Sequence, residues 1–256
     1  MKPRSTQPPF FRRPAPARAA SRIPPWLAPL LTMVSGYVDV IGYLCFYRVF
    51  VANMSGNHVR LGMAIAEGKA AEAVLRVSPI VAFAVGAVAG ELLSGGTRRP
   101  ALMNSVTRLW GCEAVALGFT TLWGATPIPD WRGLLLLGAA AFAMGLQNVS
   151  LRKSAGLTVY TTHVTGTLTT GCVLLADTAL WMFRHKHRRP FGRVARILAR
   201  LPSARQACWI LTLPVSYLAG AVLGALAYAG VGIKSLWPAV AVLVMLIAWK
   251  LLRPAR

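Results

Sequence analysis

The sequence predicts an all-α integral membrane protein, a helical bundle that crosses a lipid bilayer several times. Three observations favour this fold class. Hydrophobic residues make up 55% of the 256 residues and the mean hydropathy is positive. Only 14% of the residues are charged, against about 25% in ordinary soluble domains. The apolar residues are also gathered in blocks near the length of about 20 residues that spans a bilayer. We therefore expect the lipid bilayer to be the principal partner.

The charge of the chain is strongly positive, with a net value of +21. Such a charge is typical of nucleic-acid-binding proteins. Here, however, most Lys and Arg residues lie before Trp26, between 184 and 205, and at the ends of the apolar blocks. Membrane proteins use basic residues placed in this way to fix their orientation, with the basic side in the cytoplasm. We expect no nucleic-acid partner, a bacterial cytoplasmic (inner) membrane location, and cytoplasmic N- and C-termini.

Residues 1–25 are predicted to be a disordered, basic cytoplasmic tail. This stretch contains six Lys and Arg residues, seven prolines and no acid, so it cannot bury enough apolar surface to fold. Residues 26–252 are then one polytopic transmembrane domain. A basic insertion at 184–206 has apolar residues at helical spacing, and we expect it to be an interfacial amphipathic helix on anionic lipid.

Eight apolar blocks follow the tail, and each is expected to be helical. They run over 26–47, 49–66, 77–93, 101–124, 132–151, 165–183, 207–229 and 236–252. The second and sixth blocks open with small polar residues and glycine, which favours broken or re-entrant helices over full spans. Non-helical backbone at membrane depth is tolerated only where protein or a water-filled cavity surrounds it. These two blocks are therefore the predicted lining of a functional site.

The chain also repeats itself, with repeat one at about 26–124 and repeat two at about 132–252. The stretch 49–57 aligns with 159–167, and a GxxxG pair follows in each copy. The basic residues that flank the copies lie at opposite ends, which predicts inverted topology and three crossings per copy. The predicted bundle has two pseudo-repeats, six full spans and two broken or re-entrant helices. The alternative is eight spans in two parallel sets of four.

Polar side chains inside the apolar blocks are the candidate binding residues. Neutral donors and acceptors gather around Gly56 in one repeat and Gly166 in the other, as in discontinuous segments that bind a polar solute or an ion. Carboxylates at membrane depth are energetically unfavourable and mark functional candidates by default. The candidate residues for substrate or ion binding are Asp39, Asn53, Ser55, Gly56, Asn57, Gln147, Asn148, Thr162, His163, Thr165, Gly166, Thr167 and Asp177. Hydrogen bonding between helices is the structural alternative for the neutral side chains.

These residues favour a transporter or channel-like permease for a small polar solute or ion. Asp39 and Asp177 are the candidate groups for proton coupling. The alternatives are a membrane-embedded enzyme acting on a lipid-soluble substrate and a non-catalytic scaffold. We expect no enzymatic activity, metal or cofactor, because the common hydrolase and nucleotide motifs are missing and the His and Cys residues lack metal-ligand spacing. A homo-oligomer is left open.

Four stretches of the sequence carry a family resemblance. They are Gly36–Tyr43, Val49–Asn57, Gly145–Asn148 and Thr161–Leu168. Together they resemble the signature stretches of the YoaK-type family of bacterial transmembrane proteins, a domain of unknown function, over roughly Trp26 to Leu252. The resemblance implies a multi-span bacterial membrane protein with no assigned substrate.

Overall fold

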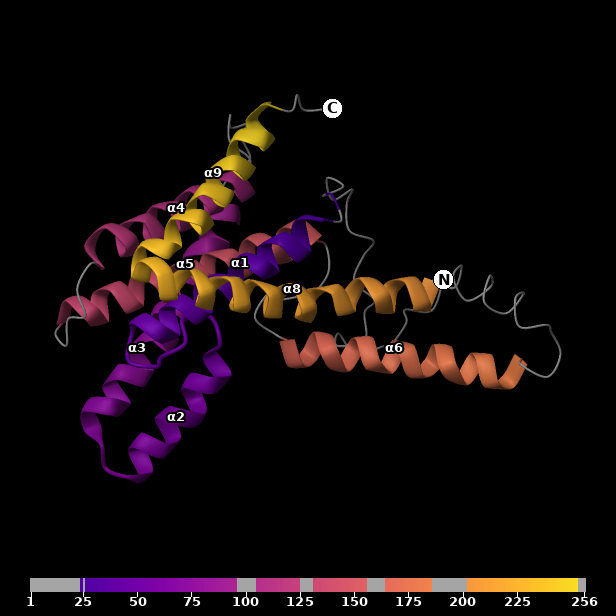
Figure 1. Cartoon of the computed structure of the whole chain (residues 1–256), viewed down its shortest axis with the longest axis horizontal. Coiled ribbons are helices and arrows are strands. Elements are labelled where there is room, and N and C mark those ends of the chain that lie inside the picture. Colours follow the sequence, from indigo (N-terminus) through magenta and orange to yellow (C-terminus); the bar gives the residue numbers. More distant parts are fainter. Residues whose placement is uncertain are drawn as a thin grey trace, which may run out of the picture.

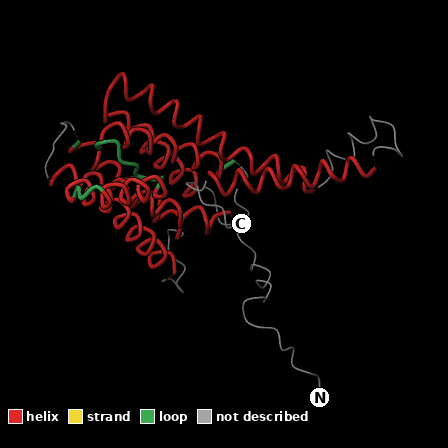
Figure 2. The backbone as a smooth tube through the Cα atoms, turned by 90° about the horizontal axis from the view of Figure 1, so that it is seen from below, coloured by secondary structure: helices red, strands yellow, loops and turns green. Residues whose placement is uncertain are grey.

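The computed structural model describes Pro24 and residues 26–95, 105–124, 131–155, 164–185 and 202–252. Within these ranges all regular secondary structure is helical, as Figure 2 shows. The prediction of an all-α fold is confirmed. Nearly all of the predicted tail and most of the predicted interfacial insertion at 184–206 lie outside the described residues.

The helices follow the apolar blocks of the sequence. They are α1 (Leu27–Cys45), α2 (Met54–Ala66), α3 (Ala70–Gly95), α4 (Ser105–Trp123), α5 (Trp131–Ala155), α6 (Val164–His185), α8 (Pro202–Val231), the 3₁₀ helix η3 (Gly232–Leu236) and α9 (Trp237–Leu252). Four stretches are long and apolar enough to cross a membrane, namely Leu27–Cys45, Ala70–Ser94, Trp131–Leu151 and Ala204–Leu252. The last of these contains α8 and α9. Large apolar side chains such as Val85 and Val222 are exposed on these helices, as contact with lipid requires.

Two helix pairs at the centre of the bundle each join the two halves of the sequence. α1 packs along α8, and α3 packs along α5, with α1 and α8 crossing the middle of Figure 1. Glycines permit this close approach. A Cβ atom added to Gly220 would lie 2.8 Å from the carbonyl carbon of Met33, and one added to Gly86 would lie 3.0 Å from that of Phe142. The glycines of both GxxxG pairs therefore act as packing residues between helices.

The buried core lies where α1, α4, α5 and α9 meet. Its fully buried side chains include Leu31, Trp110, Leu137, Met144 and Leu243. α4 contacts both α5 and α9, so it closes the side of the bundle away from α2 and α6. The polar residues described below are held between this core and the α8 helix.

Two helical hairpins extend from the bundle. α2 packs against α3, and α6 packs against α8. The two hairpins point in different directions in Figure 1, and α6 runs beside α8 toward the right of the picture. Figure 2 shows the same arm leaving the bundle at the right. The first turns of α2 and α6 lie at the inner ends of these hairpins, which brings them toward one site.

Candidate functional site

The chain reverses direction after α1. Tyr47 and Arg48 adopt left-handed backbone conformations with φ of 51° and 58°, which are uncommon for residues other than glycine. The following segment, 49–53, is not helical and returns beside α1. α2 then leads back toward the end of α1, since the guanidinium of Arg60 donates to the Arg48 carbonyl at 3.3 Å. The second apolar block, 49–66, is thus broken: its first residues, 49–53, are not helical, and the remainder forms α2.

Asp39 holds the non-helical segment in place. Its Oδ1 accepts hydrogen bonds from the backbone N–H groups of Val51, Ala52 and Asn53 at 2.9, 2.7 and 3.4 Å. Its Oδ2 accepts one from the hydroxyl of Tyr217 on α8 at 2.5 Å. The side chain is buried within α1, about 9 Å from the helix end at 1.5 Å per residue. The carboxylate therefore satisfies peptide groups that would otherwise be bare in an apolar interior.

Two asparagines determine where α2 begins. Asn53 caps the helix, because its Oδ1 accepts from the Gly56 N–H at 3.2 Å and from the Ser55 hydroxyl at 2.8 Å. Asn57 is fully buried and binds both the N–H and the carbonyl of Phe50, at 3.1 and 2.7 Å. Gly56 consequently lies inside the first helical turn. The expectation of irregular backbone around Gly56 is corrected: the break precedes the glycine, because capping by Asn53 starts the helix before it.

The sixth predicted block, 165–183, lies within α6, which runs as a continuous helix from Val164 to His185. Thr165 and Gly166 lie in its first turn, so this glycine too is inside a helix. Thr167 is buried, and its hydroxyl donates to the Val164 carbonyl at 2.9 Å. Two further candidates, Thr162 and His163, lie outside the described residues.

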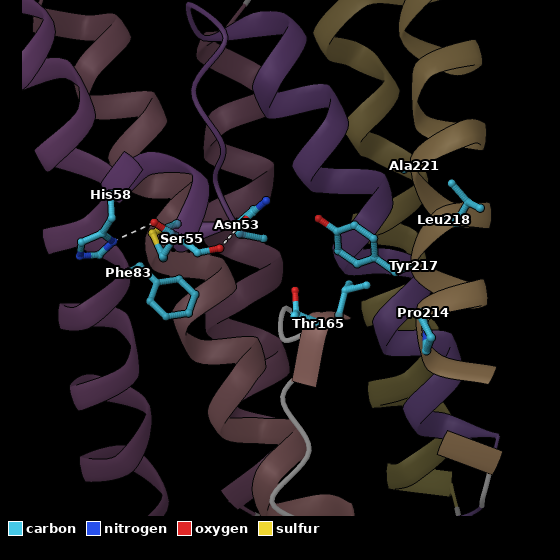
Figure 3. A pocket seen from close by; sticks show the side chains of 12 residues that line it. Asn53, Ser55, His58, Phe83, Thr165, Pro214, Tyr217, Leu218 and Ala221 are labelled. Atoms are coloured by element: carbon cyan, nitrogen blue, oxygen red, sulfur yellow. Dashed lines mark hydrogen bonds between the residues drawn. The ribbon is translucent and has the colours of Figure 1, made fainter. Parts of the chain in front are cut away.

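The first turns of α2 and α6 line one pocket together with α3 and α8 (Figure 3). Its volume is about 1110 Å³. In Figure 3 the side chains of Asn53 and Ser55 lie on one side, those of Tyr217 and Pro214 lie on the other, and Thr165 lies between them. The twelve lining residues are Ala52, Asn53, Met54, Ser55, His58, Phe83, Val164, Thr165, Pro214, Tyr217, Leu218 and Ala221. None of the twelve is acidic.

The chemistry of this pocket suits a small polar solute. The N-terminal ends of two helices face it, and such ends carry partial positive charge and free N–H groups. The Ser55 and Thr165 hydroxyls add neutral donors and acceptors, and His58 is held by its Nδ1 2.8 Å from the Met54 carbonyl. The remaining wall is apolar, with Phe83 and other hydrophobic side chains. A few directed polar groups in an apolar cavity are typical of small-molecule sites.

The other candidate residues lie away from the pocket. Gln147 and Asn148 are buried in α5; the Ser35 hydroxyl donates to Gln147 Oε1, and the Asn148 amide donates to the Met144 carbonyl at 3.1 Å. Asp177 is exposed on α6. Asn57, Thr167 and both glycines shape the helix starts without lining this pocket, and Asp39 reaches it through Tyr217.

Two aromatic lining residues were not among the candidates drawn from the sequence. Phe83 on α3 and Tyr217 on α8 both lie three residues before the first glycine of a GxxxG pair. This shared position before the two aligned GxxxG pairs is the feature of the sequence that could have identified both residues. Polar character alone could not identify Phe83, because an apolar wall residue on a membrane helix resembles a lipid-facing one.

A metal site is not formed by the described side chains. In those ranges no three His, Cys, Asp or Glu residues come together. The four cysteines are all free thiols.

Comparison with known proteins places the chain in a family. Residues 27–249 match the family model described as "Protein of unknown function (DUF1275)". The chain is 32% identical over 176 residues to the UPF0700 transmembrane protein YoaK of Bacillus subtilis (strain 168). The aligned region covers 68% of this chain and 76% of that protein. It is 29% identical over 222 residues to the UPF0700 transmembrane protein RA0705 of Rhizobium meliloti (strain 1021). This aligned region covers 86% of this chain and 83% of that protein.

No solved structure matches the chain. The names of the relatives and the long apolar helices together establish that this is a membrane protein. The resemblance to the YoaK-type family is confirmed by the same matches. The chain therefore belongs to the DUF1275 family of transmembrane proteins.

Proposed function

We propose that the protein is a transporter or channel-like permease for a small polar solute or ion. The observation that carries this proposal is the pocket between the first turns of α2 and α6. Transporters with broken helices bind their substrates at such points, where half-helix N-termini meet near the middle of the membrane. The lining of Ser55, Thr165 and Asn53, without a carboxylate, favours a neutral or anionic solute over a cation.

The proposed architecture is a pair of inverted repeats with six crossings. Helix pairing between the halves supports it, because the first helix of each half packs on the third helix of the other. A Cβ atom added to Gly36 of α1 would overlap the carbonyl oxygen of Tyr217, and one added to Gly145 of α5 would overlap that of Phe83, which precedes its GxxxG pair by the same three residues. Equivalent contacts at equivalent positions are what two related repeats produce.

In this architecture α2 and α6 start inside the membrane and leave it on opposite sides. The Arg60 contact with the carbonyl of Arg48 supports the course of α2 back toward the end of α1. The distribution of basic residues supports a cytoplasmic N-terminus, 184–206 segment and C-terminus. In bacteria the membrane would be the cytoplasmic one, and anionic lipid would contact the basic segment.

The proposal is tested first by the accessibility of the pocket to water. In a cysteine-free background, Ser55→Cys and Thr165→Cys are expected to react with a small charged thiol reagent added to intact membranes. Val85→Cys is the matched control, because Val85 is exposed on α3 and does not line the pocket. It should stay unreactive in the lipid. If both pocket cysteines are as unreactive as the control, the pocket is dry and the permease proposal is wrong.

A flux measurement then tests transport itself. Proteoliposomes are exposed to osmotic steps of glycerol, urea, nitrate or formate, and the rate of volume recovery is followed by light scattering. At least one solute should enter faster than into protein-free liposomes. Ala221→Trp, which fills the pocket, should abolish the difference, whereas Ala229→Trp on an exposed part of α8 should not. Conversion of a lipid-soluble substrate without any gradient would instead favour a membrane-embedded enzyme.

A further inference from the structure

Glu113 is a carboxyl group buried in the centre of the bundle, away from the pocket. It lies in the middle of α4 with 0% of its surface exposed. The side-chain amide of Gln147 on α5 lies beside it. The contact falls short of a hydrogen bond, because in the described part of the chain neither carboxyl oxygen of Glu113 nor Nε2 of Gln147 has a hydrogen-bond partner.

This environment suits a carboxyl group that binds and releases a proton. An ionised carboxylate without donors in an apolar interior is strongly unfavourable, so the neutral acid is the form that the closed core tolerates. The neutral acid has an O–H donor and a carbonyl acceptor, and the neighbouring amide can complement both. Asp39 differs in this respect, because its two carboxyl oxygens accept four hydrogen bonds.

No ion pair joins Glu113 to a basic residue in the described ranges. α4 packs against α3, α5, α9 and η3. The charged residues on these elements and on α4 itself are Glu72, Arg76 and Glu91 on α3, Arg132, Arg152 and Lys153 on α5, Lys234 on η3, Lys250 on α9 and Arg108 on α4. Lys250 lies over a side chain of α4, with its Nζ 5.5 Å from the ring centre of Trp110. The core around Glu113 thus offers an amide rather than a counter-charge.

A path of buried polar groups leads from Glu113 toward the pocket. Gln147 accepts a hydrogen bond from the Ser35 hydroxyl on α1. Ser35 and Asp39 are four residues apart on α1, so they share one face of the helix, and both are buried. Asp39 in turn binds the hydroxyl of Tyr217, which lines the pocket. Polar side chains from α4, α5, α1 and α8 therefore follow one another in space from Glu113 to the pocket.

We propose that Glu113 is a proton-binding site whose occupancy controls the pocket through Gln147, Ser35, Asp39 and Tyr217. The step is the reversible addition of a proton from water to the Glu113 carboxylate, which converts a charged group into a neutral acid. Ionisation requires the core to open or the amide of Gln147 to turn toward the carboxylate, and either movement is transmitted to α1 through Ser35. The coupling part of this proposal rests on the proposed function as a permease.

Proton binding can be measured without a substrate. Infrared difference spectra of the full-length protein in liposomes are recorded between a buffer of about pH 6, in which exposed carboxyl groups are ionised, and an alkaline buffer. They should contain the carbonyl-stretch band of a protonated carboxylic acid. Glu113→Gln, which imitates the neutral acid in shape, should remove that band. Asp177→Asn, which alters an exposed carboxyl on another helix, should leave it. The wild-type protein lacking the band, or the Glu113→Gln variant retaining it, would overturn the proposal without affecting the permease assignment.

Coupling is measured at the pocket. The reaction rate of Thr165→Cys with the charged thiol reagent is divided by that of Lys234→Cys, an exposed position on η3, in the same buffer, because the thiolate fraction of any cysteine rises with pH. This normalised rate should differ between the two buffers by at least about 5-fold, the lower end for coupled sites. The difference should vanish when Glu113→Gln is added and return with Glu113→Asp. If the normalised rate is the same in both buffers, or its difference survives Glu113→Gln, coupling is disproved. Labelling that is absent at every pH would instead remove the permease proposal and leave the proton site standing.

Discussion

At the scale of single residues, the main finding is that most polar side chains of the repeat motifs organise backbone rather than face solute. Asn53 caps α2, Asn57 binds Phe50, and Asp39 binds three consecutive peptide groups. Non-helical backbone in an apolar interior needs such hydrogen-bond partners, because each unpaired peptide group is unfavourable there. Ser55 and Thr165 supply the hydroxyl groups that line the pocket.

Replacement of Asp39 tests this structural role. Asp39→Ala leaves three backbone N–H groups and the Tyr217 hydroxyl without an acceptor, and each buried orphan is unfavourable by about 1–3 kcal/mol. We expect a loss of about 3 kcal/mol or more in the free energy of unfolding, measured by denaturation in detergent. Asp39→Asn keeps one acceptor oxygen and should lose less.

Asp177→Ala is the matched control for this measurement, because it removes a carboxyl that is exposed on α6. Its effect should stay within about 0.5 kcal/mol. Equal stability of Asp39→Ala and Asp177→Ala would show that the carboxylate of Asp39 does not hold the segment.

At the scale of helices, glycine positions decide which elements meet. The two GxxxG pairs place α3 on α5 and α8 on α1 with backbones in near contact. In a membrane, helix association depends on such close packing, since lipid and helix surfaces are equally apolar. These two pairs thereby fix the positions of α3 and α8, which line the pocket together with the first turns of α2 and α6.

Gly220→Ala probes this packing. The new Cβ would lie 2.8 Å from the carbonyl carbon of Met33, so α1 and α8 must separate. We expect a destabilisation of about 1–3 kcal/mol, the usual range for overpacking, seen as a lower thermal midpoint in detergent. Gly111→Ala is the control, because nothing lies within 4 Å of the added atom. A midpoint of Gly220→Ala equal to that of Gly111→Ala would contradict the close contact.

At the scale of the whole molecule, the six-crossing proposal and the eight-crossing alternative differ in the position of the loop between α2 and α3. If α2 is a half-helix that returns to its own side, this loop lies outside the cell, and so does the η3 segment. If α2 spans the bilayer fully, the loop lies in the cytoplasm, whereas η3 stays outside in both arrangements.

Labelling from one side of the membrane distinguishes the two arrangements. Ala71→Cys at the start of α3 is expected to react with a membrane-impermeant maleimide added to intact cells, because six crossings place it outside. Lys234→Cys on η3 is the positive control and should react in either case. Reaction of Ala71→Cys only after the cells are opened would favour eight crossings.

The sequence by itself determined the class of protein and the positions of its helices. Apolar blocks of membrane length, the polar opening of 49–57 and the paired glycines are local features, and they predict local structure: helices, a broken segment and close helix contacts. The break at 49–53 and the contacts of Gly86 and Gly220 follow these features, since backbone satisfaction and helix length act within a few residues of the chain.

Only the tertiary structure decided which polar residues face the pocket and which are buried as pairs. Tyr217 meets Asp39 across 178 residues, Ser35 meets Gln147 across 112, and Glu113 is left without a hydrogen bond among the described residues. The physical reason is that lipid and protein interior are both apolar. The hydrophobic pattern of a membrane helix therefore does not reveal its inward face, which is fixed by packing between segments distant in sequence.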